Sequence, residues 1–176
     1  MLKHFNCDTI YIGEYMGVHN LFQIGDKVFY PLHGAGIINA IEEKEVLGKT
    51  QEYYVIHIPI SKMDVMIPIG RIQKSGIRSI TDQDMMKEIL DELHHDETGD
   101  TLPWKERYLL NMEKMKTGEM NDSADVVHNL LLRSKEKTLN TTERQMLNQA
   151  RRNLISEIVL ITNLTEDQAT DLLKIS

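Results

Sequence analysis

The chain has 176 residues and a formal net charge of −7, which suits one domain of ordinary size or two small ones. No apolar run approaches the length of a membrane span, and the first residues lack the basic start and apolar core of an export signal. The single cysteine, Cys7, allows no internal disulfide and favours a reducing compartment. We therefore expect a cytoplasmic protein without a membrane segment.

The charge is spread unevenly along the chain. Residues 1–80 carry equal numbers of acidic and basic side chains, whereas residues 81–103 carry eight acidic side chains and a single lysine. Residues 104–152 form the only net-basic segment, with ten basic against seven acidic side chains. Local charge, rather than total charge, decides whether a surface can bind phosphates. Any nucleic-acid role would therefore belong to the segment that begins at Trp104.

Residues 1–21 show neither clear periodicity nor a targeting pattern, and we expect a disordered N-terminal extension there. Met16 follows Gly13 and Glu14, whose codons are purine-rich and suit a ribosome-binding sequence. We hypothesise that residues 1–15 are an upstream extension of the reading frame that contributes nothing to function. Mass spectrometry of the native N-terminus tests this hypothesis.

Between Lys27 and Ile80, short β-rich runs alternate with glycines. The runs are "DKVFYP", "GIINAIEEKEV", "QEYYVIHIPI", "MDVMIPI" and "GIRSI". The intervening "LGKT" is typical of a hairpin connection, and "HGAG" is typical of a turn or a bulge. Five short antiparallel strands predict a small, closed or nearly closed β-barrel of the SH3 or Tudor type.

After Thr81 the apolar period changes from two to 3.6, which indicates helices. "TDQDMMKEILDELHH" is expected to begin with Thr81 as its cap and to bury a face that carries Met85, Ile89 and Leu93. "DETGDT" then reads as a polar linker. Pro103 suits the first turn of a second helix, which is expected to run to about residue 115 and to end at a glycine, Gly118.

The remaining helices are predicted from caps and stripes. "NDSADVVHNLLLR" has Asn121 as its expected cap, and its apolar stripe consists of Val126, Val127, Leu130 and Leu131. The last two helices open with capping boxes, Asn140 with Glu143 and Thr165 with Gln168. The predicted fold class is α+β: a small antiparallel β-barrel over residues 22–80, followed by an all-α domain of four to five helices over residues 81–176.

No pattern in the chain assembles a nucleophile, a base and an oxyanion site. "HGAG" lacks the Lys-Ser/Thr of a phosphate loop, and no serine lies in a glycine-flanked nucleophile elbow. His94 and His95 point about 100° apart on a helix and have no further ligand at metal spacing. We predict a protein that is not an enzyme and that needs no metal or cofactor.

Two sets of motifs resemble a known family. "FQIGDKVFYPLHGAGIINAIEEKEVLGKTQEYYVIHI" and "VMIPIGRIQKSGIR" look like the N-terminal module of the CarD family of bacterial transcription regulators. "PWKERY", "EKMKTGE", "DVVHNLLLR" and "LNTTERQMLNQARRNLISEI" look like that family's C-terminal helical domain. The barrel alone also resembles the polymerase-interacting module of the transcription-repair coupling factor, but the helicase motor motifs of that protein are missing here.

The resemblance implies a monomeric regulator that binds two partners. Its barrel would dock on the RNA polymerase β subunit through Lys44, Val46, Met66 and Pro68, around an edge strand. Its helical domain would contact promoter DNA, weakly, at the upstream edge of the transcription bubble. Trp104, which matches the family's tryptophan, would wedge into the minor groove and hinder bubble collapse, because apolar side chains can open a base step there.

The phosphate contacts would come from the basic side chains around Trp104. The candidates are Lys105, Arg107, Arg133, Lys135, Arg144 and Arg151. Each of them has a simpler interpretation as part of a solvated helix face, and Trp104 behind a proline is ordinarily a core anchor. Arg151 and Arg152 are adjacent, so at most one of them would face DNA. Tyr108, one helical turn after Trp104, is expected to lie partly in the core and to brace the wedge.

The chain departs from the family pattern at two places. It has Glu106 and Leu109 where relatives can carry further basic residues, and Met66 where some present an arginine, while Lys44 keeps a basic group on an earlier strand. These changes predict weaker electrostatic steering. The competing hypothesis is a protein–protein adaptor with a Tudor-like barrel and no DNA role. Red-shifted, quenchable Trp104 fluorescence would favour the wedge, and shielded fluorescence a core anchor.

Overall fold

The computed structural model describes residues 21–31, 33–95 and 102–174. Its N-terminal half is a five-stranded antiparallel sheet with the strand order β4-β3-β2-β1-β5. The strands are β1 (Lys27–Tyr30), β2 (Gly34–Val46), β3 (Lys49–Ile58), β4 (Met63–Pro68) and β5 (Arg78–Ser79). The predicted N-terminal extension lies, apart from Leu21, outside the described residues, and so does the predicted linker at 96–101.

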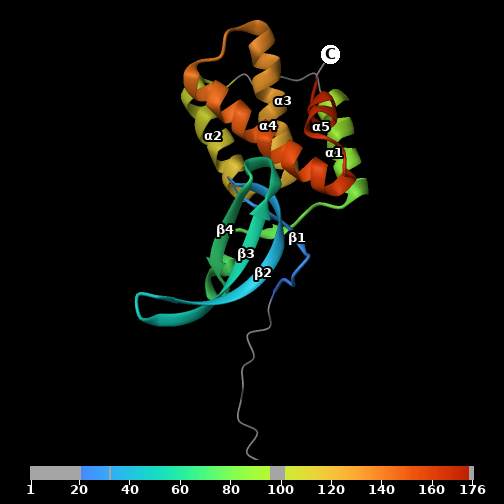
Figure 1. Ribbon diagram of the computed structural model, residues 1–176. Coiled ribbons are helices and arrows are strands. Elements are labelled where there is room, and N and C mark those ends of the chain that lie inside the picture. Colours follow the sequence, from blue (N-terminus) through green and yellow to red (C-terminus); the bar gives the residue numbers. More distant parts are fainter. Residues whose placement is uncertain (1–20, 32, 96–101, 175–176) are drawn as a thin grey trace, which may run out of the picture.

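The predicted hairpin is confirmed. β2 and β3 are joined by Leu47 and Gly48, both at positive φ, and Val46 pairs with Lys49 across the turn. Two successive residues at positive φ match the right-handed twist of the strands. In Figure 1 this hairpin extends away from the helices, well past the body of the sheet.

The barrel core follows from the alternation of side chains along the strands. Tyr54 of β3 is fully buried and pairs with Ile41 on β2 and with Ile67 on β4. The inward side chains form one apolar cluster: Phe22, Val28, Ile38, Tyr54, Ile56, Ile58, Ile67, Ile69, Ile72 and Ile77. The opposite face of the same strands therefore remains available for contacts outside the barrel.

The C-terminal half contains five α-helices among the described residues. They are α1 (Gln83–His95), α2 (Trp104–Thr117), α3 (Met120–Glu136), α4 (Thr141–Thr162) and α5 (Glu166–Asp171). The long helix α4 contacts α1, α3 and α5 as well as β2, so it lies between the barrel and the other helices (Figure 1). A membrane-spanning helix is not found in the part of the chain that the structure describes.

The capping boxes at Asn140 and Thr165 are confirmed: each side chain accepts from the backbone N–H three residues later, and the reciprocal bond is also present. The prediction that Thr81 caps α1 is wrong, because Asp82 Oδ1 accepts from the N–H groups of Asp84 (3.0 Å) and Met85 (2.9 Å). Met85, which was expected on the buried face, is half exposed. Ile89 and Leu93 are buried as predicted, and Met86 and Leu90 complete the buried face.

The cap predicted at Asn121 is also wrong. α3 begins at Met120, and its N-cap, Glu119, lies two residues before the predicted one and makes no side-chain capping bond. Instead, the Glu119 N–H donates to the hydroxyl of Thr117 at 3.1 Å, so the last turn of α2 supplies the acceptor. The predicted end of α2 at Gly118 is confirmed, with φ of 75° in the left-handed region that glycine tolerates.

Candidate functional site

Trp104 is the first residue of α2, directly after Pro103, which is the N-cap rather than part of the first turn. The indole is 47% exposed, so Trp104 is not a core anchor. One turn later, Tyr108 stacks against it, with ring centroids 5.9 Å apart and an interplanar angle of 17°. Tyr108 itself is partly buried against the helical core, as predicted. The stack holds the exposed indole on a ring that the core fixes.

The exposure of Trp104 follows from where its stripe meets the core. Trp104, Tyr108 and Met112 are spaced four residues apart, and Met115 continues the same face of α2. Met115 is buried, Met112 and Tyr108 are partly buried, and Trp104 extends beyond the core at the end of the helix. Periodicity assigns Trp104 to the inward face, but only the packing shows that the core ends before it.

Arg107 corrects the predicted phosphate contacts. Its side chain is 3% exposed, and its Nη2 donates to Glu143 Oε1 at 2.8 Å. Its Nη1 donates to the carbonyl oxygen of Leu102 at 2.7 Å. A guanidinium buried in this way has no donor left at the surface for a phosphate. Arg107 instead fastens the start of α2 to the start of α4, immediately behind Trp104.

Glu143 is the acceptor at the centre of this contact. It also completes the capping box, because its Oε2 accepts from the Asn140 N–H at 3.1 Å. Burial by itself raises the pKa of Glu143, but the hydrogen bonds from Arg107 and Asn140 and the charges of Arg107 and Arg133 outweigh burial and lower the pKa. The carboxylate is therefore charged at neutral pH and holds both guanidiniums beside the helix start.

Four of the remaining basic candidates lie at the start of α2, the end of α3 and the start of α4, where Arg107 and Glu143 join the helices. Lys105 follows it in α2, and Arg144 lies next to Glu143 in the first turn of α4; both are exposed. Arg133 and Lys135 are in the last turn of α3, which leads into α4. Because Arg133 Nε lies 3.5 Å from Glu143 Oε1, part of its charge is balanced within the protein. The result is a modestly basic rim around an aromatic projection.

Arg151 lies elsewhere. It is two helical turns beyond Arg144 in α4 and lines a shallow groove between α4, α5 and the barrel. The groove is also lined by Ile60, Asn148, Arg152, Ile155, Glu166 and Thr170. Arg152 donates to the carbonyl oxygen of Ile60 at 3.2 Å and to Ser61 Oγ at 3.0 Å, so this adjacent residue contacts the barrel. The structure therefore separates Arg151 from the rim around Trp104.

The four barrel candidates share one face of the sheet. β3 pairs Val55 with Met66 and Tyr53 with Pro68. Lys44 lies on the same outer side of β2, since its Nζ contacts Met66 Sδ at 3.2 Å and forms an ion pair with Glu42 Oε2 at 3.2 Å. Val46 is two residues further along β2 and is 46% exposed. The outer sheet face thus combines Lys44, Val46, Met66 and Pro68 around the edge strand β4.

Two residues beyond the predicted candidates also belong to these surfaces. The sequence signals Glu143 only as part of a capping box, and Tyr53, which pairs with Pro68, lies on the outer sheet face. The period-two alternation of β3 could have identified Tyr53. No short-range signal pairs Arg107 with Glu143, because the two residues are 36 positions apart. Among the described residues, no group of three or more His, Cys, Asp or Glu side chains could hold a metal ion.

Comparisons with known proteins cover both halves of the chain. A family profile described as the CarD-like/TRCF RID domain matches residues 22–81, and one described as CarD, C-terminal domain, matches residues 88–174. YdeB of Bacillus subtilis (strain 168), which its name describes as a transcription factor, is 51% identical over 148 residues. That alignment covers 84% of this chain and 97% of YdeB. This chain belongs to the CarD family.

The family membership makes the chain a transcription factor. One similar solved structure is the solution structure of the 72-residue N-terminal domain of Myxococcus xanthus CarD, with 31% sequence identity and a TM-score of 0.30. The match covers 33% of this chain and 77% of the CarD domain chain. The outer sheet face falls within the first CarD match, and Trp104 with its basic rim falls within the second. The two candidate surfaces thus belong to different modules of the CarD architecture.

Proposed function

We propose that this CarD-family protein binds the RNA polymerase β subunit through its outer sheet face and stabilises the promoter open complex with Trp104. In this proposal the helical domain lies at the upstream edge of the transcription bubble, and the indole enters the minor groove there. The observation that carries the proposal is the exposed indole stacked on a core-fixed tyrosine. Because the stack on Tyr108 restricts the Trp104 side chain before binding, the indole loses little conformational entropy when it contacts DNA.

A modest interaction is sufficient for this role. A gain of about 1.4 kcal/mol in the open state changes its equilibrium about tenfold. Distorting a pyrimidine–purine step in the minor groove costs only a few kcal/mol. Insertion of Trp104 alone can therefore supply the energy that stabilises the open complex, provided that another contact holds the protein at the promoter.

The basic rim supports weak DNA binding rather than strong binding. Arg107 is buried, Arg133 is partly balanced by Glu143, and Arg151 lies on another part of α4. Lys105, which directly follows Trp104, and Lys135 and Arg144 at the neighbouring helix ends remain as exposed candidates. Few phosphate contacts predict weak, salt-sensitive affinity for free DNA. Polymerase binding through the barrel would then supply a high effective concentration of the helical domain at the promoter.

The outer sheet face suits a protein partner. β4 is one of the two edge strands of the sheet, and Lys44, Met66 and Val46 place a mixed apolar and charged surface beside it. An exposed edge can pair with or pack on another chain. The family profile over this domain is shared with the transcription-repair coupling factor, as its description states, and this common module supports polymerase as the partner.

The wedge is tested by measuring the lifetime of the open complex with purified polymerase, a responsive promoter and a competitor. We expect the wild-type protein to lengthen the lifetime and Trp104→Ala to lose most of that effect. Leu110→Ala is the matched control, since Leu110 is 43% exposed on the same helix but lies about 120° around it from Trp104. Equal lifetimes for Trp104→Ala and the wild type would exclude the wedge.

The polymerase contact is tested by a pull-down with a fragment of the β subunit. Lys44→Glu reverses the charge at the centre of the outer sheet face and is expected to weaken binding strongly. Lys74→Glu makes the same charge change on an exposed residue at the end of a 3-10 turn, away from that face, and is expected to bind normally. If Lys44→Glu binds as well as Lys74→Glu, the interface lies elsewhere.

A further inference from the structure

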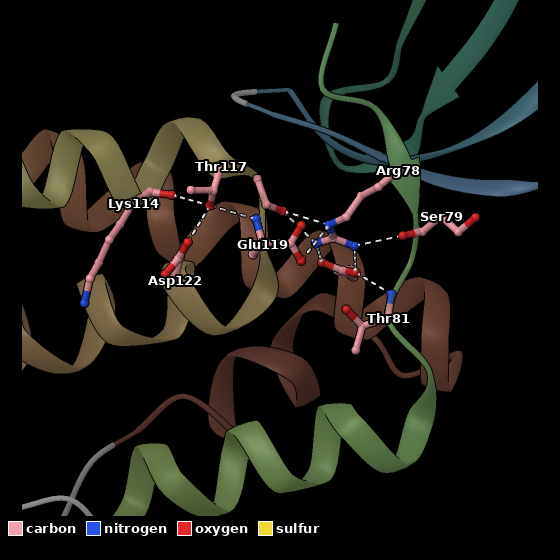
Figure 2. Close-up of polar contacts among 9 residues, drawn as sticks. Arg78, Ser79, Thr81, Lys114, Thr117, Glu119 and Asp122 are labelled. Atoms are coloured by element: carbon pink, nitrogen blue, oxygen red, sulfur yellow. Dashed lines mark hydrogen bonds and ion pairs between the residues drawn. The ribbon is translucent and has the colours of Figure 1, made fainter. Parts of the chain in front are cut away.

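The barrel and the helical domain meet through polar contacts that are unusually complete. Arg78, in the edge strand β5, makes five hydrogen bonds, the number of N–H groups in a guanidinium. Two of them run to the carboxylate of Glu157 in α4, at 2.7 and 2.9 Å, and two run to the carbonyl oxygen of Gly118, at 3.0 and 2.7 Å. Figure 2 shows Arg78 reaching from its strand towards the helices, with Glu119 nearby.

Glu157 is buried, with 1% of its side chain exposed, and it accepts from the Thr81 N–H at 2.7 Å as well as from Arg78. The charge of Arg78 also lies over the ring of Phe29, 4.6 Å from its centroid. A bidentate arginine–carboxylate pair has a fixed geometry, unlike a contact made by a lysine. This cluster therefore fixes the orientation of the two domains as well as their proximity.

Close backbone packing surrounds the cluster. A Cβ atom on Gly118 would lie 2.7 Å from Cγ of Pro31, and one on Gly34 would lie 2.8 Å from Ser156 Oγ. The Ala35 N–H donates to the same Ser156 hydroxyl oxygen at 2.9 Å. At these points the backbone of one domain lies directly against a side chain of the other, with no space for a Cβ atom on either glycine, which leaves little room for rotation.

Gly118 is the residue that ends α2, and Trp104 is the residue that begins it. The helix has 14 residues, so it is a rod of about 21 Å with the barrel at one end and the indole at the other. Arg78 satisfies a carbonyl oxygen just past the C-terminal end of this rod, and Arg107 fastens its N-terminal end to α4. A rotation of the barrel about α4 would move the outer sheet face relative to Trp104.

We propose that Arg78 is a positioning residue: with Glu157 and Gly118 it locks the barrel to α2, so that polymerase docking and the Trp104 wedge act at a fixed separation. This inference rests on the proposed function and adds to it the element that couples the two surfaces. If the domains were loosely joined, docking of the barrel would spread the indole over many positions and dilute its effective concentration at the promoter.

The lock is tested with Arg78→Lys and Glu157→Gln in the full chain. Lysine keeps the charge but lacks the planar fork that bonds both carboxylate oxygens of Glu157, and glutamine keeps the shape without the charge. We expect both variants to bind the β fragment normally and to lose about tenfold in the open-complex lifetime effect. Small-angle X-ray scattering should show a larger radius of gyration than for the wild type.

Val127→Ala is the control for simple destabilisation, since Val127 is fully buried in the helical core and lies outside the lock. At a temperature where both proteins are folded, it should keep the wild-type lifetime. If a lock variant does not fold, Lys27→Met removes only the peripheral bond from Lys27 Nζ to the carbonyl oxygen of Leu160, at 2.6 Å, and should shift the lifetime in the same direction.

The outcomes separate the two proposals. If the wild type lengthens the lifetime and the lock variants do so equally, the coupling is overturned while the proposed function stands. If Val127→Ala shortens the lifetime as much as Arg78→Lys, the effect is one of stability and the coupling is likewise overturned. If the wild type has no effect on lifetime, the proposed function fails, and the coupling fails with it, whatever the scattering shows.

Discussion

α2 is held at each end by an arginine that pairs with a buried glutamate of α4. One of the two pairs lies within the helical domain, and the other joins the barrel to that domain. At the N-terminal end, Arg107 and Glu143 lie within the helical domain, with side chains 3% and 7% exposed. At the C-terminal end, Arg78 comes from the barrel, with its side chain 19% exposed, and reaches Glu157 and Gly118. The two glutamates are 14 residues apart on α4, a rise of about 21 Å.

The difference lies in what each pair fixes. The Arg107–Glu143 pair shares its carboxylate with the capping box at Asn140. It therefore ties the start of α2, which carries Trp104, to the start of α4. The Arg78–Glu157 pair joins the barrel to the helical domain and so helps to fix the distance between the outer sheet face and Trp104. The first pair should therefore dominate stability, and the second should dominate the coupling of functions.

The largest loss of stability is expected for Glu143→Ala. It leaves the guanidinium of Arg107 buried without its charged partner, and breaking one side of a buried pair costs about 3–5 kcal/mol. The loss of the capping box adds to this cost. Urea denaturation followed by circular dichroism measures the change in the free energy of unfolding.

The double variant Arg107→Met with Glu143→Met sharpens this test. Removing both charges leaves no fully buried unpaired ion, because Arg133, the other cation beside Glu143, is 27% exposed and reaches solvent. The double variant should therefore be more stable than Glu143→Ala, although two side chains are changed. If the double variant is instead the less stable protein, the burial of an uncompensated charge is not the source of the loss.

Acidification should reduce the contribution of the Arg107–Glu143 pair to the free energy of unfolding. The pKa of Glu143 is lowered in the folded protein, so the unfolded chain takes up the proton at a higher pH than the folded one. Its contribution to stability is complete above the usual carboxyl pKa of 4.5 and is lost as the pH falls through the lower folded value. Urea midpoints measured at a series of pH values below neutrality should fall more steeply for the wild type than for Glu143→Gln.

Much of the fold could be predicted from the sequence, because local chemistry decides it. The hairpin at Leu47 and Gly48, the capping boxes of α4 and α5 and the glycine end of α2 are all signalled within a few residues. The two wrong caps, at Thr81 and Asn121, are errors of one and of two residues, since the observed positions are Asp82 and Glu119. Neighbouring Asp, Thr and Asn have similar capping propensities, and tertiary packing chooses between them.

The candidate site was less predictable because its decisive contacts are long-range. Trp104 was identified from its rarity and its basic neighbours, but its exposure depends on where the core ends. Arg107 carried the same charge signal as Lys105, yet it is buried because Glu143 lies 36 positions later on a facing helix. The importance of Arg78 had no local signal, since its partners are 40 and 79 positions away.

A smaller loss is expected for Asn140→Ala, which removes the side chain that accepts from the Glu143 N–H at 2.9 Å. Loss of such a cap costs about 1 kcal/mol. The Arg107–Glu143 ion pair stays in place, so the variant separates the cap from the pair. Thermal unfolding measures it, and a loss as large as that of Glu143→Ala would mean that the cap, not the ion pair, fastens α4.

The smallest effect is expected for Lys116→Ala on the surface of α2. Lys116 Nζ lies 2.8 Å from Glu113 Oε1, a distance as short as in the buried pairs, but the two side chains are 59% and 71% exposed. Water screens an exposed pair, and holding two long side chains together costs entropy, so such pairs contribute about 0–1 kcal/mol. Lys116→Ala and Glu143→Ala thus compare two contacts of equal length at opposite extremes of burial, in the same urea titration. If Lys116→Ala loses nearly as much stability as Glu143→Ala, the distance between the charges alone sets the strength of these pairs. Burial would then not distinguish the two arginine–glutamate pairs from the exposed pair on the surface of α2.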